Sequence, residues 1–154
     1  LATSHDPEIA HHAFVLFCDF LHKAGLENAV LGNPANSKNP GFLISPAAGF
    51  NKNGEIHPNV LCALGFDYSL IGTVPYEPWQ GSPKPRIRRF PETESMVNWM
   101  GLPGEGADAV ARRIENYGKH NVPIIINIAP TPNKKGDSAI RDLEQTVKTL
   151  RNLP

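Results

Sequence analysis

The sequence has few cysteines, no net charge and no long apolar run, and each absence excludes a class of protein. The two cysteines, Cys18 and Cys62, form neither a zinc spacing nor a redox Cys-x-x-Cys pair, so we expect buried free thiols in a reducing compartment and no metal site. No apolar run approaches the roughly 20 residues that a membrane-spanning helix needs. The formal net charge of zero gives no reason to expect nucleic acid as a partner.

The composition that remains is that of a folded domain. Apolar residues make up 40% of the 154 residues and charged residues 19%, which favours a globular domain with its own core over a disordered chain. The 13 glycines and 15 prolines exceed ordinary use, so we expect long ordered loops to matter here.

The N-terminal part of the sequence predicts one long helix. Asp6 suits the N-cap, Pro7 suits the first helical position, and Gly25 ends the pattern. From residue 13 to residue 21 every residue except Asp19 is apolar. A helix that is apolar on most of its circumference is either deeply buried or lies in a membrane surface, and we favour burial.

After a polar connection over residues 26–41, apolar strands alternate with helices. The pattern predicts strands at 41–45, 67–74 and 122–127, helices at 57–65, 107–119 and 137–150, and a long proline-rich loop at 75–106. This order is typical of a parallel α/β fold, either a doubly wound sheet or a TIM barrel. Three strands cannot close a barrel, which takes about 250 residues. The chain is therefore expected to form half of a fold.

Small residues and a lysine follow the first predicted strand. Parallel α/β folds place their sites at the carboxyl ends of the strands. Ala47, Ala48 and Gly49 leave room there for a flat group against the backbone, and Lys52 supplies a positive charge for a carboxylate or an electron-rich ring atom. Taken singly, the small residues could equally pack a tight turn, and the lysine could be a solvated loop residue.

Neutral polar side chains add to the same edge. The second predicted strand ends at Thr73, the third at Asn127, and the long loop contributes Asn98. Each alone has a plain alternative, since Thr73 could pack a strand end and Asn127 could cap a loop. Their convergence is what favours a site for a planar heteroaromatic cofactor and a small acid.

Several motifs together resemble one enzyme family. The stretches AAGFNKNGE (47–55), LGFDYSLIGTV (64–74), NWMG (98–101) and IIINI (124–128), with the opening DPE-x-AH, resemble dihydroorotate dehydrogenase, and in particular its membrane-associated, quinone-dependent class 2. The match covers only the N-terminal half of such an enzyme. It implies an N-terminal helical extension at residues 1–25 that contacts membrane and quinone, and at residues 26–154 the first half of an FMN-binding (β/α)8 TIM barrel.

The resemblance also implies a reaction of pyrimidine biosynthesis and a set of contacts. Dihydroorotate loses a proton from C5 and a hydride from C6 to the flavin, which gives orotate, and the reduced flavin passes its electrons to quinone. The implied FMN contacts are Ala47, Ala48, Gly49, Lys52, Thr73, Asn98 and Asn127, and the implied contacts of dihydroorotate or orotate are Lys52, Asn98, Met100, Gly101 and Leu102.

No catalytic residue is assigned in this chain. By the resemblance, the base is a serine that belongs beyond Pro154, as do the loops that hold the FMN phosphate. We therefore expect a longer natural product, or a cleaved chain of which this is one piece, with the remaining C-terminal half of the barrel as its partner. We expect this stretch alone to be inactive.

A quinone site is implied at the N-terminal helix. Its residues would be Pro7, Ala10, His11, Phe50 and Arg89, with peripheral attachment to the cytoplasmic side of the inner membrane, or to the mitochondrial inner membrane in a eukaryote. Without the resemblance, His11 would be a surface histidine. Residues 84–90 would then be a solvated basic loop or a weak contact with anionic lipid, and no role is assigned to Arg86 or Arg88.

Four departures separate the sequence from the family pattern. Asn51 replaces an aspartate, Trp99 and Leu102 replace an arginine and a phenylalanine, Val74–Tyr76 alters the TVTP signature, and 129–132 replaces Gly-Lys-Asn-Lys. A related flavin dehydrogenase with another small substrate therefore remains open. So does a catalytically silent half-barrel that serves as a binding module.

Overall fold

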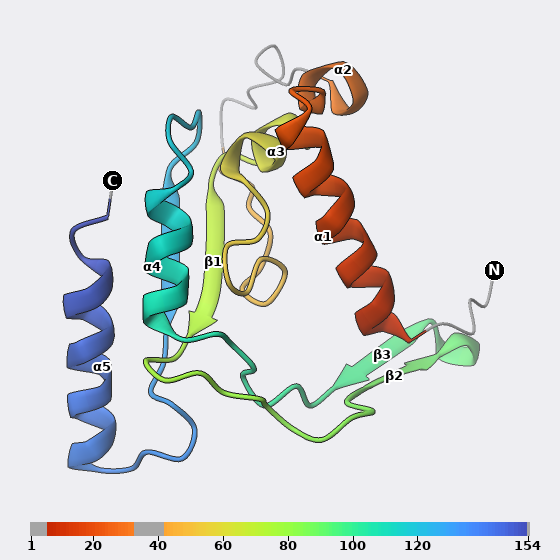
Figure 1. Cartoon of the computed structure of the whole chain (residues 1–154). Coiled ribbons are helices and arrows are strands. Elements are labelled where there is room, and N and C mark those ends of the chain that lie inside the picture. Colours follow the sequence, from red (N-terminus) through yellow and green to blue (C-terminus); the bar gives the residue numbers. More distant parts are fainter. Residues whose placement is uncertain (1–5, 33–41, 154) are drawn as a thin grey trace.

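The computed structural model describes residues 6–32 and 42–153, which form a mixed α/β structure (Figure 1). The elements, in chain order, are α1 (Pro7–Lys23), α2 (Glu27–Leu31), α3 (Pro58–Ala63), β1 (Ser69–Val74), β2 (Ile87–Phe90), β3 (Ser95–Asn98), α4 (Ala107–Glu115), β4 (Ile124–Ile128) and α5 (Asp137–Leu150). Most of the predicted polar connection, residues 33–41, lies outside the described residues. No helix in the described part is both long and apolar enough to cross a membrane.

The N-terminal helix α1 starts as the sequence predicts. The Asp6 side chain accepts a hydrogen bond from the Glu8 backbone N–H (2.9 Å), and Pro7 stands in the first turn. Deep burial was predicted, and only one face has it: Val15, Cys18 and Leu21 are buried. The other face leaves Ile9, Leu16, Phe17 and Phe20 exposed. The prediction of burial is therefore wrong for half of the helix.

Parallel pairing of the strands is confirmed for β1 and β4. Ser69 lies opposite Ile124 and Ile71 opposite Ile126, and the register shifts between Ile71 and Val74. Helices α4 and α5 cover one face of this pair (Figure 1), and the core there joins β1, α4 and Leu150 of α5. The apolar sequence 122–127 is that of a buried strand, but β4 has helices on one face only, so Ile125 is 48% exposed and the strand is only partly buried.

The predicted strand at 41–45 is wrong, because residues 42–46 have no regular structure. The Ile44 N–H donates to the Asp67 carboxylate (2.7 Å), and the Ile44 carbonyl accepts from the Asp67 N–H (2.8 Å). The next links along the chain join the Gly49 N–H to the Gly72 carbonyl (2.6 Å) and the Gly72 N–H to the Asn51 carbonyl (3.1 Å). Between them Pro46 has no N–H to donate, and residues 42–46 form no ladder of hydrogen bonds with β1.

A short hairpin lies within the predicted loop at 75–106. Strands β2 and β3 pair antiparallel, with Ile87 opposite Asn98, and a single 3₁₀ turn at Pro91–Thr93 joins them. Both strands are only four residues long and mostly exposed, and they follow a proline-rich stretch. Strands this short and exposed carry no alternating apolar pattern, so the sequence did not predict them.

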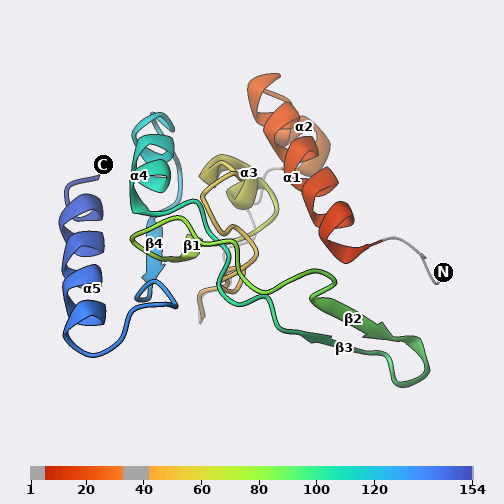
Figure 2. The same ribbon diagram turned by 60° about the horizontal axis from the view of Figure 1, so that its bottom comes forward.

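Helix α1 lies on the side of β1 away from α4 and α5, and its N-terminal end comes close to the β2–β3 hairpin in both views (Figures 1 and 2). Its C-terminal half packs on α3 through a second apolar core that contains Val15, Cys18, Ile56 and Val60. Both cysteines are free, as predicted, with Cys18 buried and Cys62 partly buried.

Candidate functional site

One open cavity of about 1430 Å³ lies between α1, the turn that follows residue 48, and the loops on either side of the β2–β3 hairpin. Eleven of the predicted site residues line it: Pro7, His11, Ala48, Gly49, Phe50, Lys52, Thr73, Arg89, Asn98, Met100 and Leu102. Ala10, Ala47, Gly101 and Asn127 are not among the lining residues. The structure thus gathers around one space residues that are up to 95 positions apart in the chain (7 to 102).

Lys52 lines this cavity and is half-buried. In the described part of the chain its ammonium makes no hydrogen bond or ion pair. Burial, and then the nearby positive charge of Arg86, lower the pKa of Lys52 below its usual value, whereas Glu8 and Glu55 act in the opposite direction. A desolvated cation with no partner favours an anionic ligand, because an anion would restore the lost interactions.

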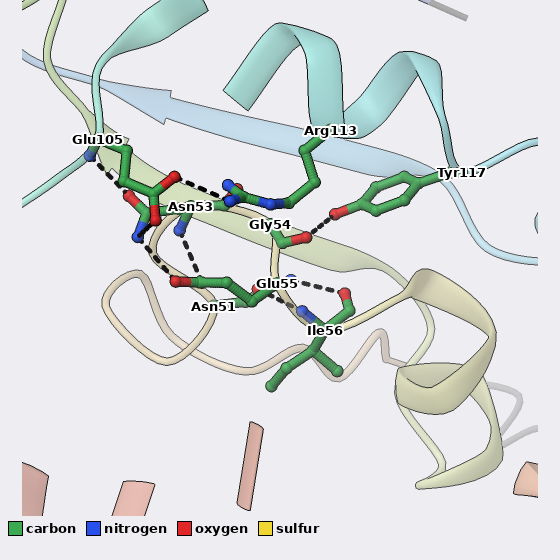
Figure 3. A network of polar contacts seen from close by, with 8 residues as sticks. All are labelled: Asn51, Asn53, Gly54, Glu55, Ile56, Glu105, Arg113 and Tyr117. Carbon is green, nitrogen blue, oxygen red and sulfur yellow. Dashed lines mark hydrogen bonds and ion pairs between the residues drawn. The ribbon is translucent and has the colours of Figure 1, made fainter. Parts of the chain in front are cut away.

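The turn that carries Lys52 is closed by its neighbour Asn51. Asn51 is fully buried, its Nδ2 donates to the Ile56 carbonyl and its Oδ1 accepts from the Ile56 N–H, both at 3.0 Å (Figure 3). An amide supplies one donor and one acceptor, so both backbone groups of the buried Ile56 are satisfied. Both polar atoms of the Asn51 side chain are thus bonded within this turn, and Asn51 does not line the cavity.

A second set of contacts ties the same turn to α4 (Figure 3). Arg113 Nη1 donates to the Asn53 carbonyl (2.7 Å), and its Nη2 pairs with Glu105 Oε2 (2.8 Å). The Tyr117 hydroxyl donates to the Gly54 carbonyl. The Asn53 side chain completes the network by accepting from the Glu105 N–H (2.9 Å). Lys52 therefore projects from a segment fixed on both sides.

The backbone beside the turn offers open space. The Gly49 N–H donates to the Gly72 carbonyl (2.6 Å). Gly49 has φ +100°, a backbone conformation that residues with a side chain rarely adopt. A Cβ at Gly49 would meet no atom within 4 Å, and Ala47 and Ala48 are exposed. On the neighbouring strands Thr73 Oγ1 donates to Asn127 Oδ1 (2.9 Å), so the two predicted strand-end residues do come together.

The segment from Asn98 to Leu102 is held from outside by a second glycine turn. Gly81 and Gly101 both have positive φ, and the Ser82 N–H donates to the Met100 carbonyl (2.9 Å). A Cβ on Gly81 would lie 2.3 Å from that carbonyl, so only glycine permits this approach. Leu102 has φ +56°, which turns the chain back along the cavity.

The sequence analysis gave Glu8 and Arg86 no role in the site, yet both line the cavity and form an ion pair there. One interpretation of residues 84–90 was a solvated basic loop, but Arg86 is only 8% exposed. Its guanidinium is paired with Glu8 of α1. A glutamate in a first helical turn is ordinarily explained by the helix dipole alone. No local pattern links residues that are 78 positions apart.

The histidine of α1 lies beside the same cavity. The His11 ring packs edge-to-face on Phe50, with 5.6 Å between ring centroids. Burial, followed by the charge of Lys52, lowers the pKa of His11.

The sequence matches the dihydroorotate dehydrogenase family over residues 27–153. A dihydroorotate dehydrogenase (quinone) of a Nitratiruptor species is 34% identical across 96% of this chain and 45% of the relative. The one of Acidithiobacillus ferrooxidans is 38% identical across 96% of this chain and 34% of the relative.

Solved structures match as well. The crystal structure of the dihydroorotate dehydrogenase of Eimeria tenella in complex with ferulenol superposes with a TM-score of 0.71 at 26% identity, covering 94% of this chain and 41% of that one. The ligand-free form gives the same score. The chain thus spans less than half the length of these relatives and corresponds to their N-terminal part. Its fold matches part of their TIM barrel, with the N-terminal helix present. The chain belongs to the dihydroorotate dehydrogenase family.

Proposed function

We propose that this chain is the N-terminal half of an FMN-dependent enzyme that oxidises dihydroorotate and reduces quinone. The reaction converts dihydroorotate and quinone into orotate and quinol, so that two electrons and two protons leave C5 and C6 of the substrate and reach the quinone. When bound, FMN supplies the acceptor of the hydride from C6 and passes the electrons on. The observation that carries the proposal is the convergence of the eleven predicted residues on one cavity around a half-buried Lys52 that has no ion-pair partner among residues 6–32 and 42–153.

The residues present fit a flavin. Ala47, Ala48 and Gly49 leave the backbone uncovered, and the open space beside Gly49 can take a flat ring. The hydroxyl of Thr73 and the amide of Asn127 lie at the adjoining strand ends and can exchange hydrogen bonds with ring atoms. In this assignment Lys52 and Asn98 also contact the ring.

Lys52 and the segment 98–102 form the proposed substrate side. The Lys52 ammonium would bind the carboxylate of dihydroorotate, and Asn98 would hold the pyrimidine amide groups. Met100 and Leu102 line the same space, and Gly101 lies between them in the chain. The chain's role in the chemistry is thus to bind and orient the substrate, while the base belongs to the remaining part of the barrel.

Quinone would enter beside α1. Pro7, His11, Phe50 and Arg89 line the cavity, whereas Ala10 is exposed on the helix next to them. The exposed apolar face of α1 (Ile9, Leu16, Phe17 and Phe20) supports peripheral attachment to the inner membrane. A division into an extension (1–25) and a half-barrel (26–154) remains a prediction.

The visible absorption spectrum of the purified full-length protein tests the proposal. A flavin spectrum that bleaches when dihydroorotate is added is the expected result. Lys52→Ala should lower kcat/KM for dihydroorotate about 10- to 100-fold, because a charge-assisted hydrogen bond contributes roughly 1.5–3 kcal/mol. Lys148→Ala, at an exposed lysine of α5, is the matched control. A protein that binds no FMN would contradict the proposal.

A related flavin dehydrogenase is the second candidate, because Leu102 in the cavity wall replaces the phenylalanine of the family pattern. A flavin that does not bleach with dihydroorotate but bleaches with another small acid or pyrimidine would establish it.

A further inference from the structure

The ion pair between Glu8 and Arg86 joins α1 to the rest of the site. Arg86 Nε donates to Glu8 Oε1 (3.0 Å) and its Nη2 to Glu8 Oε2 (2.8 Å), a two-pronged contact. The side chains are only 10% and 16% exposed. Lys84 adds a third charge at 3.4 Å from Glu8. The pKa of Glu8 is lowered, chiefly by the hydrogen bond to Arg86, so the carboxylate is ionised near neutral pH.

Arg86 also donates hydrogen bonds to the loop at residues 80–82, which contacts the segment 98–102. Its Nη1 donates to the Gln80 carbonyl (2.6 Å) and the Ser82 carbonyl (3.3 Å). The Ser82 N–H in turn holds the Met100 carbonyl. One guanidinium therefore connects α1 on one side with the 98–102 segment on the other. Glu8 takes part in the first connection only.

Glu8 provides the polar anchor of the first turn of α1, whereas the apolar contacts of the helix lie further along it. Val15 and Cys18 pack against α3. The rings of His11 and Phe14 pack against Phe50, with 5.6 and 5.7 Å between ring centroids. In the first turn Glu8 contacts its two cations, Lys84 and Arg86. Both ribbon views bring this end of α1 close to the hairpin (Figures 1 and 2).

We propose that Glu8 and Arg86 are positioning residues for the electron acceptor, because their ion pair holds the first turns of α1 against the hairpin and so keeps His11 and Arg89 on the same cavity. This inference rests on the proposed function. A loosened α1 would open the acceptor side of the cavity, while Lys52 and the segment 98–102, which are fixed by other contacts, would keep binding the substrate. Loss of Glu8 should therefore affect one half of the reaction and spare the other.

The test uses the full-length, flavin-loaded protein and separates the two half-reactions. The variants are Glu8→Gln, which keeps the shape and removes the charge, Arg86→Lys, which keeps the charge and removes the fork, and Glu92→Gln, an exposed control on the hairpin turn. Stopped-flow measurements follow flavin reduction by dihydroorotate. In a separate mixing experiment, flavin reduced beforehand with dithionite is reoxidised by a short-chain ubiquinone. Hydrogen–deuterium exchange follows the amides of residues 8–12.

In Glu8→Gln we expect reoxidation by quinone to slow about tenfold or more, since breaking a buried charge pair is costly. Flavin reduction should stay within about twofold, and exchange at residues 8–12 should rise. Arg86→Lys should slow both half-reactions, and Glu92→Gln neither. Equal slowing of both half-reactions in Glu8→Gln, or unchanged reoxidation, would overturn the proposal, as would unchanged exchange.

Failure of the proposed function would be distinct from failure of this inference. It would show in the unsubstituted protein as absent flavin or as a flavin that dihydroorotate does not reduce. The dithionite experiment needs no substrate, and the exchange experiment needs no flavin, so the effect of the ion pair on α1 would still be decided.

Discussion

The turn that carries Lys52 offers a prediction whose size follows from two hydrogen bonds. Asn51→Leu keeps the approximate volume of the side chain and removes both of its bonds to Ile56, each 3.0 Å long. Asn51 and Ile56 are fully buried, so no water replaces the lost partners. A buried polar group without a partner costs about 1–3 kcal/mol. Two such groups predict a loss of roughly 2–6 kcal/mol in the free energy of unfolding.

Asn51→Asp gives an intermediate case. The carboxylate can still accept from the Ile56 N–H, but when ionised it cannot donate to the Ile56 carbonyl. We expect about half the loss seen for Asn51→Leu. The order of stability should therefore be Asn, then Asp, then Leu at this position.

Guanidinium chloride unfolding of the full-length protein, with the same excess of FMN in every sample, measures these differences. Asn133→Leu at an exposed turn position is the control and should change stability by no more than about 0.5 kcal/mol. A loss in Asn51→Leu as small as that of the control would refute the reasoning. It would mean that Ile56 finds other partners and that the turn does not depend on Asn51.

Two further predictions concern the contacts around that turn. His57 is buried, its Nδ1 accepts from a backbone N–H, and burial is the main cause that lowers its pKa below the usual 6.5. Below that pH the unfolded chain takes up a proton that the folded chain resists, so the free energy of unfolding should fall from pH 7 to pH 5. His57→Asn, which retains a cap, should flatten this dependence; an equal slope in both proteins, measured by denaturant titrations at each pH, would contradict it. Tyr117→Phe removes the hydrogen bond to Gly54 and keeps the ring, so we expect a loss of about 1 kcal/mol and a severalfold higher KM for dihydroorotate. An unchanged KM would show that Lys52 keeps its position without this bond.

Much of the scaffold could be predicted from local sequence. The cap at Asp6, the helix at 137–150 and the parallel pairing of two apolar strands follow from patterns a few residues long. The failures have a common cause. Residues 42–46 carry a strand-like composition, yet Ile44 bonds only to Asp67, which precedes β1, and the segment forms no ladder with the strand itself. The exposure of Ile125 likewise depends on which elements cover the sheet.

Local sequence predicted which small and polar residues would lie on the cavity, but not how distant side chains meet there. Thr73 lies at the end of β1, as the rule for parallel folds predicts. Ala48, Gly49 and Lys52 reach the same cavity although the segment before them is not a strand. The contact between Glu8 and Arg86 has no local signal, because each residue alone has an ordinary explanation.

The rebuilt segment after β4 is explained by contacts made within the fold. Thr131 is fully buried, and both its N–H (2.7 Å) and its hydroxyl (3.0 Å) donate to the Asp142 carboxylate of α5. The Thr131 Oγ1 also accepts from the Glu77 N–H (3.1 Å). The departure at 129–132 therefore joins α5 to the loop after β1, and none of its residues lines the cavity.

The departures from the family pattern differ in how directly they can affect the choice of substrate, because not all of the replaced residues line the cavity. Asn51 faces the backbone of Ile56, so its replacement of an aspartate removes no charge from the cavity wall. The backbone N–H of Trp99 donates to the Arg86 carbonyl (3.0 Å), and Trp99 does not line the cavity. Leu102 alone among the replaced residues borders the space. A smaller apolar side chain there enlarges the cavity without changing its charge, so under the proposed function any difference in substrate should be one of size, and the proposed contact of Lys52 with the acidic group is unaffected.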